Sequence, residues 1–297
     1  MALEPKIKHI LIDVALGLVL LIASLTGQVQ AGFVTAFLIA LFGATLIGFF
    51  RGRANPANLI PQWLLLSSWF AIFLLTIRTN PAAAALPAAA YGGSLLGLLA
   101  GKIWKEPAWA IRLGVALAAS AGFGLYGASL LPEMLQNLLG KTVNQAAPEL
   151  SLTDLHGQEV SLEDWKGKTV VLNLWVTRDR ACHQQMDEMA ALYADLSQDT
   201  TVQFAWYTST ALVDSIPSAK AYLDVHHPEL PAFHEISPDF NPGTWAIKGV
   251  PSLMLIDTAG VVRYRHEGYD ASEKFGDRIK LELNRIHPTP LFPTERE

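Results

Sequence analysis

The stretch LNLWVTRDRACHQQM, from Leu172 to Met186, predicts a buried β-strand that runs directly into a helix. The strand belongs to a longer run, TVVLNLWV, which is almost entirely β-branched and apolar, as expected for a central strand covered on both faces. Beyond it, apolar side chains recur at steps of four, three, four and three, the spacing of one helix face. These side chains are Cys182, Met186, Met189, Tyr193 and Leu196.

The sequence around this stretch predicts further strands and another helix. ELSLTDLHGQEVSL, Glu149 to Leu162, indicates two short strands around a turn, and TVQFAWYTS, Thr201 to Ser209, indicates another buried strand. VPSLMLID, Val250 to Asp257, is followed by TAG and VVRYRHEG, which together predict a hairpin, and SEKFGDRIKLELNRI predicts a closing amphipathic helix. This order of strands and helices is typical of an α/β layered domain.

Charge is distributed unevenly along the chain. Of its 297 residues 51% are hydrophobic and 16% are charged, below the roughly 25% charged residues of ordinary soluble domains. Long apolar runs dominate up to about Leu139, and ordinary globular composition begins at Lys141. We therefore predict a transmembrane helical domain over residues 1–140 and a soluble domain over residues 141–297. The net charge of −5, without a basic stripe, argues against a nucleic-acid partner.

The first half predicts a helical bundle of about five membrane spans, because a bilayer span needs about 20 mostly apolar residues. The candidates are Ile10–Gly27, Phe33–Phe50, Trp63–Ile77, Ala83–Gly101 and Trp109–Leu131. The third candidate is short, so four spans and a surface segment are the competing arrangement. The glycines of YGGSLLGLLAG, Tyr91 to Gly101, have the small-residue spacing that lets membrane helices pack closely.

Basic residues predict the orientation, because Lys and Arg accumulate on cytoplasmic loops. With five spans, one side receives Arg78 and Lys141, and the other receives Lys6, Lys8, Arg51, Arg53, Lys102, Lys105 and Arg112. We therefore expect a bacterial inner-membrane protein with a cytoplasmic N-terminus and a periplasmic C-terminal domain. Asp13 and Arg112 are the charged residues inside the predicted spans, and both are expected to reach the nearby membrane interface.

The soluble half resembles the membrane-anchored periplasmic thioredoxin-like proteins of the TlpA/ResA type, in the AhpC/TSA-redoxin superfamily. GQEVSLEDWKGKTVVLNLWVT and the helix after it resemble one signature of that family, and GVPSLMLIDTAGVVRYRHEGY resembles the second. The similarity runs from about Ala147 to Ile286. It implies a thioredoxin-like fold with a cis peptide between Val250 and Pro251, which faces the active-site helix and shapes a surface that grips a peptide partner.

The resemblance breaks where that family keeps its two reactive cysteines, four and seven residues after the tryptophan that ends the strand. Here Trp175 is the tryptophan, Asp179 occupies the first cysteine position and Cys182 the second. Cys182 is the single cysteine of the chain, which excludes an intramolecular dithiol couple. Asp179 can neither attack a disulfide nor resolve one. It is predicted to cap the helix, which stabilises a helix by about 0.5–2 kcal/mol.

Three roles are open for Cys182. On the apolar helix face it is expected to be a buried small hydrophobe with an inert thiol. Peroxiredoxins use a lone peroxidatic cysteine, but their Pro/Thr pattern is not evident in WVTRDRAC. In the third role, an external thiol from a partner completes the chemistry, and Arg178, Arg180 and His183 would lower the pKa of an exposed thiol.

Neither a metal nor another cofactor is predicted. His226, His227, His234 and Glu235 are close together in VHHPELPAFHE, but two prolines in this segment suggest a solvated surface loop. One cysteine also excludes a four-cysteine zinc site.

The sequence favours a non-catalytic protein that docks to, stabilises or helps assemble a protein partner in the inner membrane or periplasm, anchored in the lipid bilayer. The predicted partner-binding residues are Trp175, Arg178, Arg180, Val250 and Pro251. The alternative is a thiol–disulfide oxidoreductase resembling TlpA/ResA, linked to cytochrome maturation, which acts through Cys182 and an external thiol.

Overall fold

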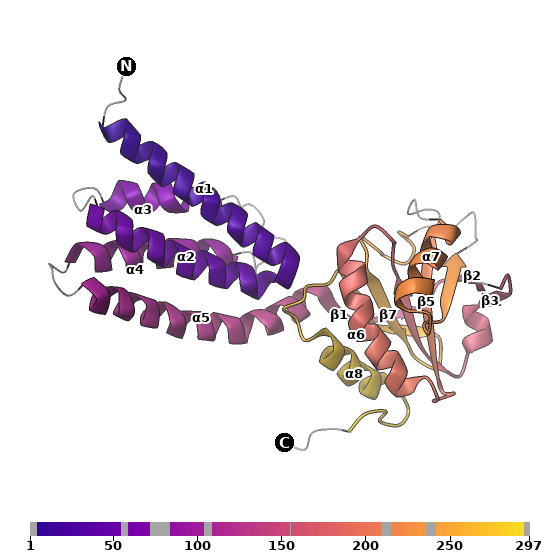
Figure 1. Cartoon of the computed structure of the whole chain (residues 1–297). Helices are drawn as coiled ribbons and strands as arrows, with labels where there is room; N and C mark the ends of the chain where they lie inside the picture. The colour runs from indigo at the N-terminus through magenta and orange to yellow at the C-terminus, as the bar shows by residue number, and fades with distance from the viewer. Residues whose placement is uncertain are drawn as a thin grey trace. The chain divides into compact units, whose positions relative to one another are not determined.

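The computed structural model describes residues 5–54, 59–71, 84–103, 109–154, 156–209, 215–235 and 242–293. The chain divides into two compact units, Met1–Leu135 and Gln136–Glu297 (Figure 1). The helices of the first part of the chain are α1 (Pro5–Ala31), α2 (Phe33–Ala54), α3 (Leu59–Ser67), α4 (Ala85–Ile103) and α5 (Trp109–Leu139).

Three helices within the described residues are long and apolar enough to cross a membrane: Ile7–Ala31, Phe33–Ala54 and Trp109–Leu139. The predicted third span begins within α3, a helix of nine residues. Residues 72–77 of this predicted span lie outside the described part of the chain. Arg78 and Lys105 of the orientation argument also lie outside it. The count of five spans and the orientation therefore stay predictions.

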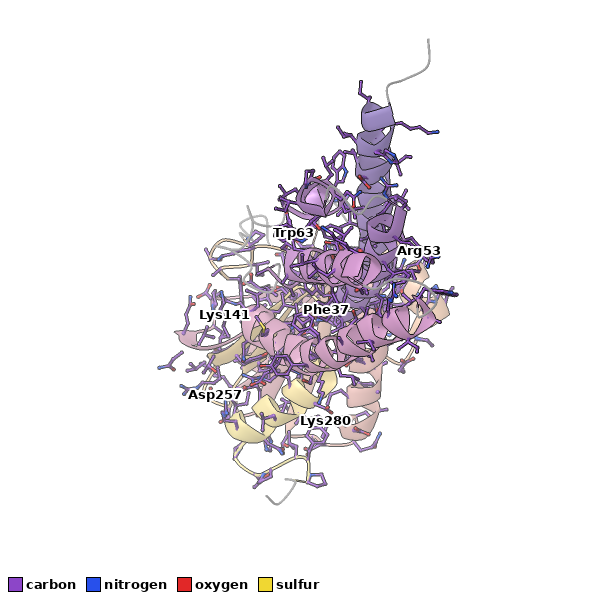
Figure 2. The ribbon with its side chains drawn as sticks, turned by 90° about the vertical axis from the view of Figure 1, so that its left-hand side faces the viewer. Phe37, Arg53, Trp63, Lys141, Asp257 and Lys280 are labelled. Atoms are coloured by element: carbon purple, nitrogen blue, oxygen red, sulfur yellow. The ribbon has the colours of Figure 1, made fainter. Side chains whose placement is uncertain are left out.

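Helices α2 and α4 pack closely through glycine, as the spacing of small residues predicts. A Cβ atom on Gly97 would lie 2.1 Å from the carbonyl oxygen of Thr45, and one on Gly93 would lie 2.4 Å from that of Leu41. Any larger residue at these positions would push the two backbones apart. Phe37, labelled in Figure 2, lies in the buried apolar cluster of this helical unit.

The two charged residues of the predicted spans, Asp13 and Arg112, are buried in the helical unit. Asp13 is buried in the protein and its Oδ1 atom lies 2.5 Å from Nε of Arg51, which is also buried. Arg112 is buried as well. Where Asp13 and Arg112 lie relative to the membrane interface stays a prediction. Charges enclosed by helices are less costly when they are paired and hydrogen-bonded, as Asp13 is with Arg51.

The second unit is built on one mixed sheet. Among the described residues it has eight strands, in the order β1-β8-β7-β4-β5-β6-β2-β3. Strand β4 pairs parallel with β5 and antiparallel with β7. The strands are β1 (Gly140–Ala146), β2 (Ser151–Asp154), β3 (Glu159–Ser161), β4 (Thr169–Leu174), β5 (Val202–Ser209), β6 (Ala232–Glu235), β7 (Ser252–Ile256) and β8 (Val261–Glu267).

Apolar side chains cover both faces of this sheet. On one face pack the helices α6 (Arg180–Leu196), α7 (Ile216–His226) and α8 (Phe275–Ile286), in a cluster that contains Val171 and Trp206 (Figure 1). On the other face, Leu172 and Leu174 pack with Trp165, from the short 3₁₀ helix Leu162–Trp165, and with Trp245. The central strand is buried along its whole length. This architecture agrees with the α/β thioredoxin-like domain that the sequence predicts for the C-terminal half.

Candidate functional site

Asp179 begins the site, at the junction of β4 and α6. Its backbone is extended, with φ −99° and ψ 121°, and its Oδ1 atom accepts a hydrogen bond of 3.0 Å from the backbone N–H of Cys182. This contact satisfies one of the free donors at the start of the helix. The predicted helix cap is confirmed, and the position that would hold an attacking cysteine holds a carboxylate engaged with the backbone.

Cys182 lies one turn into α6 with none of its surface exposed. It belongs to the apolar cluster that also contains Trp175, Met186 and Met189, which confirms the predicted helix face. A nucleophilic cysteine needs a thiolate that a substrate can reach. In this conformation Cys182 is packed as a core residue.

The peptide bond between Val250 and Pro251 is cis, as the resemblance implied. Val250 is partly buried and packs against the apolar cluster that holds Cys182. Trp175 is 1% exposed and Pro251 is also buried, so these two predicted partner-binding side chains support the surface from below and do not form it. Arg178 and Arg180 are exposed beside them.

An aromatic stack that the sequence analysis missed borders this surface. The ring of His183 stacks on Tyr222 with centroids 4.3 Å apart, and Tyr222 in turn lies 4.5 Å from the ring of His226. The Nε2–H group of His183 donates to the carbonyl oxygen of Thr177 (2.8 Å), which fixes the ring. A signal was present, because Tyr222 and His226 are four residues apart and so share one helix face.

Partial burial, together with the nearby carboxylate of Asp187 and then the Cys182 side chain, raises the pKa of Tyr222. Tyr222 is therefore neutral at physiological pH. It presents a phenol ring that can pack against a ligand and donate a hydrogen bond.

The histidine-rich segment is not the solvated loop that the sequence suggested. His226 ends α7, His227 is buried beside Asp187, and His234 and Glu235 are buried residues of β6. The physical reason is that β6 lies inside the sheet, between β5 and β2. Within the described ranges, no group of three or more His, Cys, Asp or Glu side chains could hold a metal ion.

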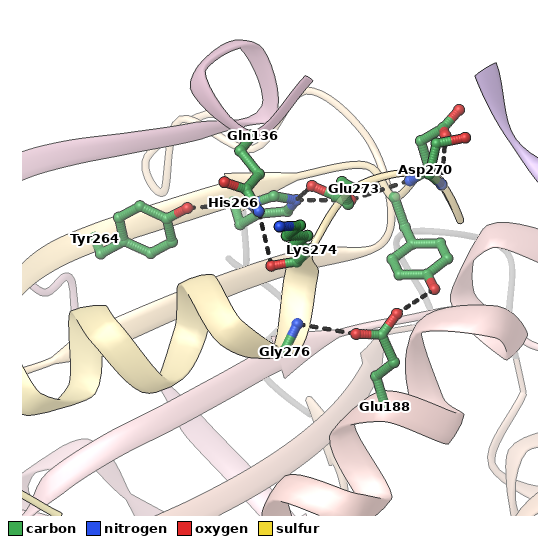
Figure 3. Close-up of polar contacts among 10 residues, drawn as sticks. Gln136, Glu188, Tyr264, His266, Asp270, Glu273, Lys274 and Gly276 are labelled. Atoms are coloured by element: carbon green, nitrogen blue, oxygen red, sulfur yellow. Dashed lines mark hydrogen bonds and ion pairs between the residues drawn. The ribbon is translucent and has the colours of Figure 1, made fainter. Parts of the chain in front are cut away.

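A second group of polar side chains lies under the segment before α8 (Figure 3). Nε2 of His266 lies 3.1 Å from Oε2 of Glu273, and Nδ1 of the same ring lies 3.2 Å from the hydroxyl of Tyr264. Nearby, the Tyr269 hydroxyl donates to Oε1 of Glu188 (2.6 Å) and the Gly276 N–H donates to Oε2 (2.9 Å). His266 and Glu273 have no exposed side-chain surface, so this cluster ties elements together and is not open to a substrate.

Comparison with known proteins shows what this unit is similar to. Residues 143–265 match the model of the AhpC/TSA family. The thioredoxin-like protein YneN of Bacillus subtilis is 27% identical over 162 residues, which are 54% of this chain and 91% of YneN. The thiol-disulfide oxidoreductase ResA of Bacillus thuringiensis subsp. konkukian is 24% identical over 164 residues, 55% of this chain and 89% of ResA.

Residues 143–265 of the second unit are therefore similar to the AhpC/TSA redoxin family, and the relatives that match it are of the ResA and YneN type. With Asp179 and Cys182 at the two motif positions, its CxxC motif is degenerate. A solved thiol:disulfide interchange protein of Chlorobium tepidum is 21% identical, with a TM-score of 0.39, over 48% of this chain and 99% of that one.

Proposed function

We propose that this protein is a membrane-anchored thioredoxin-like protein whose redoxin domain binds a protein partner and does not exchange disulfides itself. One observation carries the proposal: Asp179 stands at the attacking position and caps α6, while Cys182 is fully buried behind it. The proposed binding surface consists of the cis-proline turn and the exposed side chains of Arg178 and Arg180. Binding at this surface does not require a reactive thiol.

The proposed setting is the bacterial inner membrane, with the N-terminus in the cytoplasm, about five spans, and the redoxin domain in the periplasm. The apolar helices of the first unit and the uneven distribution of Lys and Arg support it. A reporter enzyme that works only outside the cytoplasm, fused after Glu297, should be active. Activity of a cytoplasmic reporter at the same position would contradict this orientation.

A second candidate function is a thiol–disulfide oxidoreductase that acts through Cys182 with a thiol supplied by a partner, as in a cytochrome-maturation system. The ResA relatives, which are thiol-disulfide oxidoreductases, favour it. Cys182 would then have to leave its packed position before any sulfur could reach it.

One assay separates the two candidates. The purified full chain should not reduce a disulfide substrate, because it has no accessible thiol pair. The Asp179→Cys variant restores a pair of cysteines at the spacing of the family motif and should gain this activity, whereas the double variant Asp179→Cys, Cys182→Ala should not. If the wild type reduced the disulfide substrate as fast as an active Asp179→Cys variant, this result would contradict the non-catalytic binding function.

The biological role gives the complementary test. Cys182→Ala should keep the fold and the role in the cell, because the side chain serves only as part of the core. Loss of the role in this variant at normal protein levels would favour the oxidoreductase.

A further inference from the structure

We propose that the surface at the start of α6 binds an extended acidic peptide segment of the partner protein. The inference rests on the proposed binding function and names the chemistry of the partner. Three features carry it: the floor of the surface, its charge and its aromatic border.

The floor brings residues from three parts of the sequence together. The buried ring of Trp175 lies 5.7 Å from the ring of Tyr222 on α7, and it shares an apolar cluster with Cys182 on α6. Val250, just before the cis-proline, packs against the same cluster. The contacts of Trp175 and His183 with the ring of Tyr222 join the start of α6 to the side of α7, and the cis-proline turn shares their apolar cluster through Val250.

The exposed charges at the start of α6 and just before the cis-proline turn are positive, whereas the exposed carboxylate of Asp187 lies on the α7 side, near Tyr222 and His227. Arg178, Arg180 and Lys248, which lies two residues before Val250, all have exposed side chains. The described residues give neither Arg180 nor Lys248 an acidic partner. The acid closest in sequence to both arginines is Asp179, and its carboxylate is engaged with the backbone N–H of Cys182.

This charge is local, because the whole chain has a formal net charge of −5. A cationic face on an acidic protein attracts an anionic partner and disfavours wrong partners. So few cations do not form the basic stripe that nucleic acid needs, which favours a short acidic peptide.

The aromatic border gives the peptide an apolar contact. The rings of His183, Tyr222 and His226 form a continuous stack along α6 and α7. Such rings offer large and rigid contact area at low entropic cost, and the Tyr222 hydroxyl adds a hydrogen-bond donor. An acidic segment that also carries an apolar side chain therefore fits this surface best.

The test uses the full chain in nanodiscs of neutral lipid and a fluorescent peptide of alternating Glu, Leu and Gly residues. Fluorescence anisotropy should show binding that weakens as salt is added, and a peptide with Lys in place of Glu should not bind. The double variant Arg180→Glu, Lys248→Glu should bind the acidic peptide at least about tenfold more weakly.

The matched control is Lys141→Glu, Lys166→Glu, which changes the net charge equally at exposed positions outside this face. It should bind like the wild type, and circular dichroism should show that both double variants are folded. Equal loss of affinity in both would overturn the proposal, and so would the absence of binding by wild type. Binding to vesicles of anionic lipid that displaces the peptide would overturn it too, since the face would then serve the membrane.

Failure of this inference can be distinguished from failure of the proposed function. A partner that co-purifies equally with the wild type and with Arg180→Glu, Lys248→Glu would refute the acidic peptide and leave the binding function intact. Disulfide reduction by the wild type would refute the non-catalytic function whatever the peptide does.

Discussion

Two regions of the second unit contain residue types that often take part in catalysis, but their surroundings differ. At the start of α6, Asp179 is partly exposed, but its carboxylate accepts a backbone hydrogen bond and Cys182 beside it is buried. Around His266, a histidine, a glutamate and a tyrosine lie within hydrogen-bond distance, but His266 and Glu273 have no exposed surface (Figure 3).

The difference shows that residue type alone does not identify a reactive site. The first region keeps the position of a redox centre and has lost one of the two thiols it would need. The second has an acid, a base and a hydroxyl that contact one another inside the protein. Buried polar groups that are fully paired rigidify a fold, while exposed ones with spare hydrogen-bonding capacity can bind.

The largest effect should follow from breaking the buried pair. Glu273→Leu leaves Nε2 of His266 and the N–H of Asp270 without their acceptor, and should cost about 3–5 kcal/mol of unfolding free energy. Hydrogen exchange of the β8 amides in the full chain measures this cost. The matched variant His266→Leu, Glu273→Leu removes both partners and should recover part of the loss. If the double variant loses as much as the sum of the two single changes, the pairing is not what stabilises this region.

The next effect concerns the hydroxyl of Tyr264. Burial raises the pKa of Tyr264 to about 12; Arg278 partly opposes the rise and Glu282 adds to it. Because the folded pKa lies above the unfolded value of about 10, stability from the neutral phenol is complete below pH ~10 and is lost as the pH rises through about 12. The total loss is about 2–3 kcal/mol.

The alkaline unfolding of wild type and Tyr264→Phe measures this difference. Tyr264→Phe removes the ionisable group and should unfold less steeply between pH ~10 and ~12. The buried Tyr207 and the partly buried Tyr269 also have raised pKa values and give both proteins a common background. Identical alkaline profiles would show that the Tyr264 phenol is more accessible than its packing indicates.

The sequence predicted the parts of this comparison that depend on local spacing. The offset from Trp175 placed Asp179 at a helix start, and the apolar steps placed Cys182 on the buried face. Both are confirmed, because capping and helix periodicity involve residues within one or two turns.

The parts that depend on distant contacts were missed. His234 and Glu235 were predicted to be loop residues, because the sequence near them has no pattern that indicates a strand. In the structure, β6 pairs with both β5 and β2. The Asp13–Arg51 pair joins residues 38 positions apart, and the pairing of His266 with Glu273 needs the whole turn before α8. Such pairs follow from the tertiary fold and have no short-range pattern.

The smallest effect should come from the start of α6, which tests what replaced the redox chemistry. Asp179→Ala removes the acceptor for the Cys182 N–H and should cost about 0.5–2 kcal/mol in unfolding free energy, far less than Glu273→Leu. Asp179→Asn keeps an acceptor oxygen and should retain most of the stability, since Asn caps helices about as well as Asp. Hydrogen exchange of the first turn of α6 measures both. Equal losses in the two variants would mean that the negative charge matters more than the hydrogen bond. Asp179 would then act mainly on the helix dipole, and its charge would also weaken the attraction of an acidic peptide to Arg180.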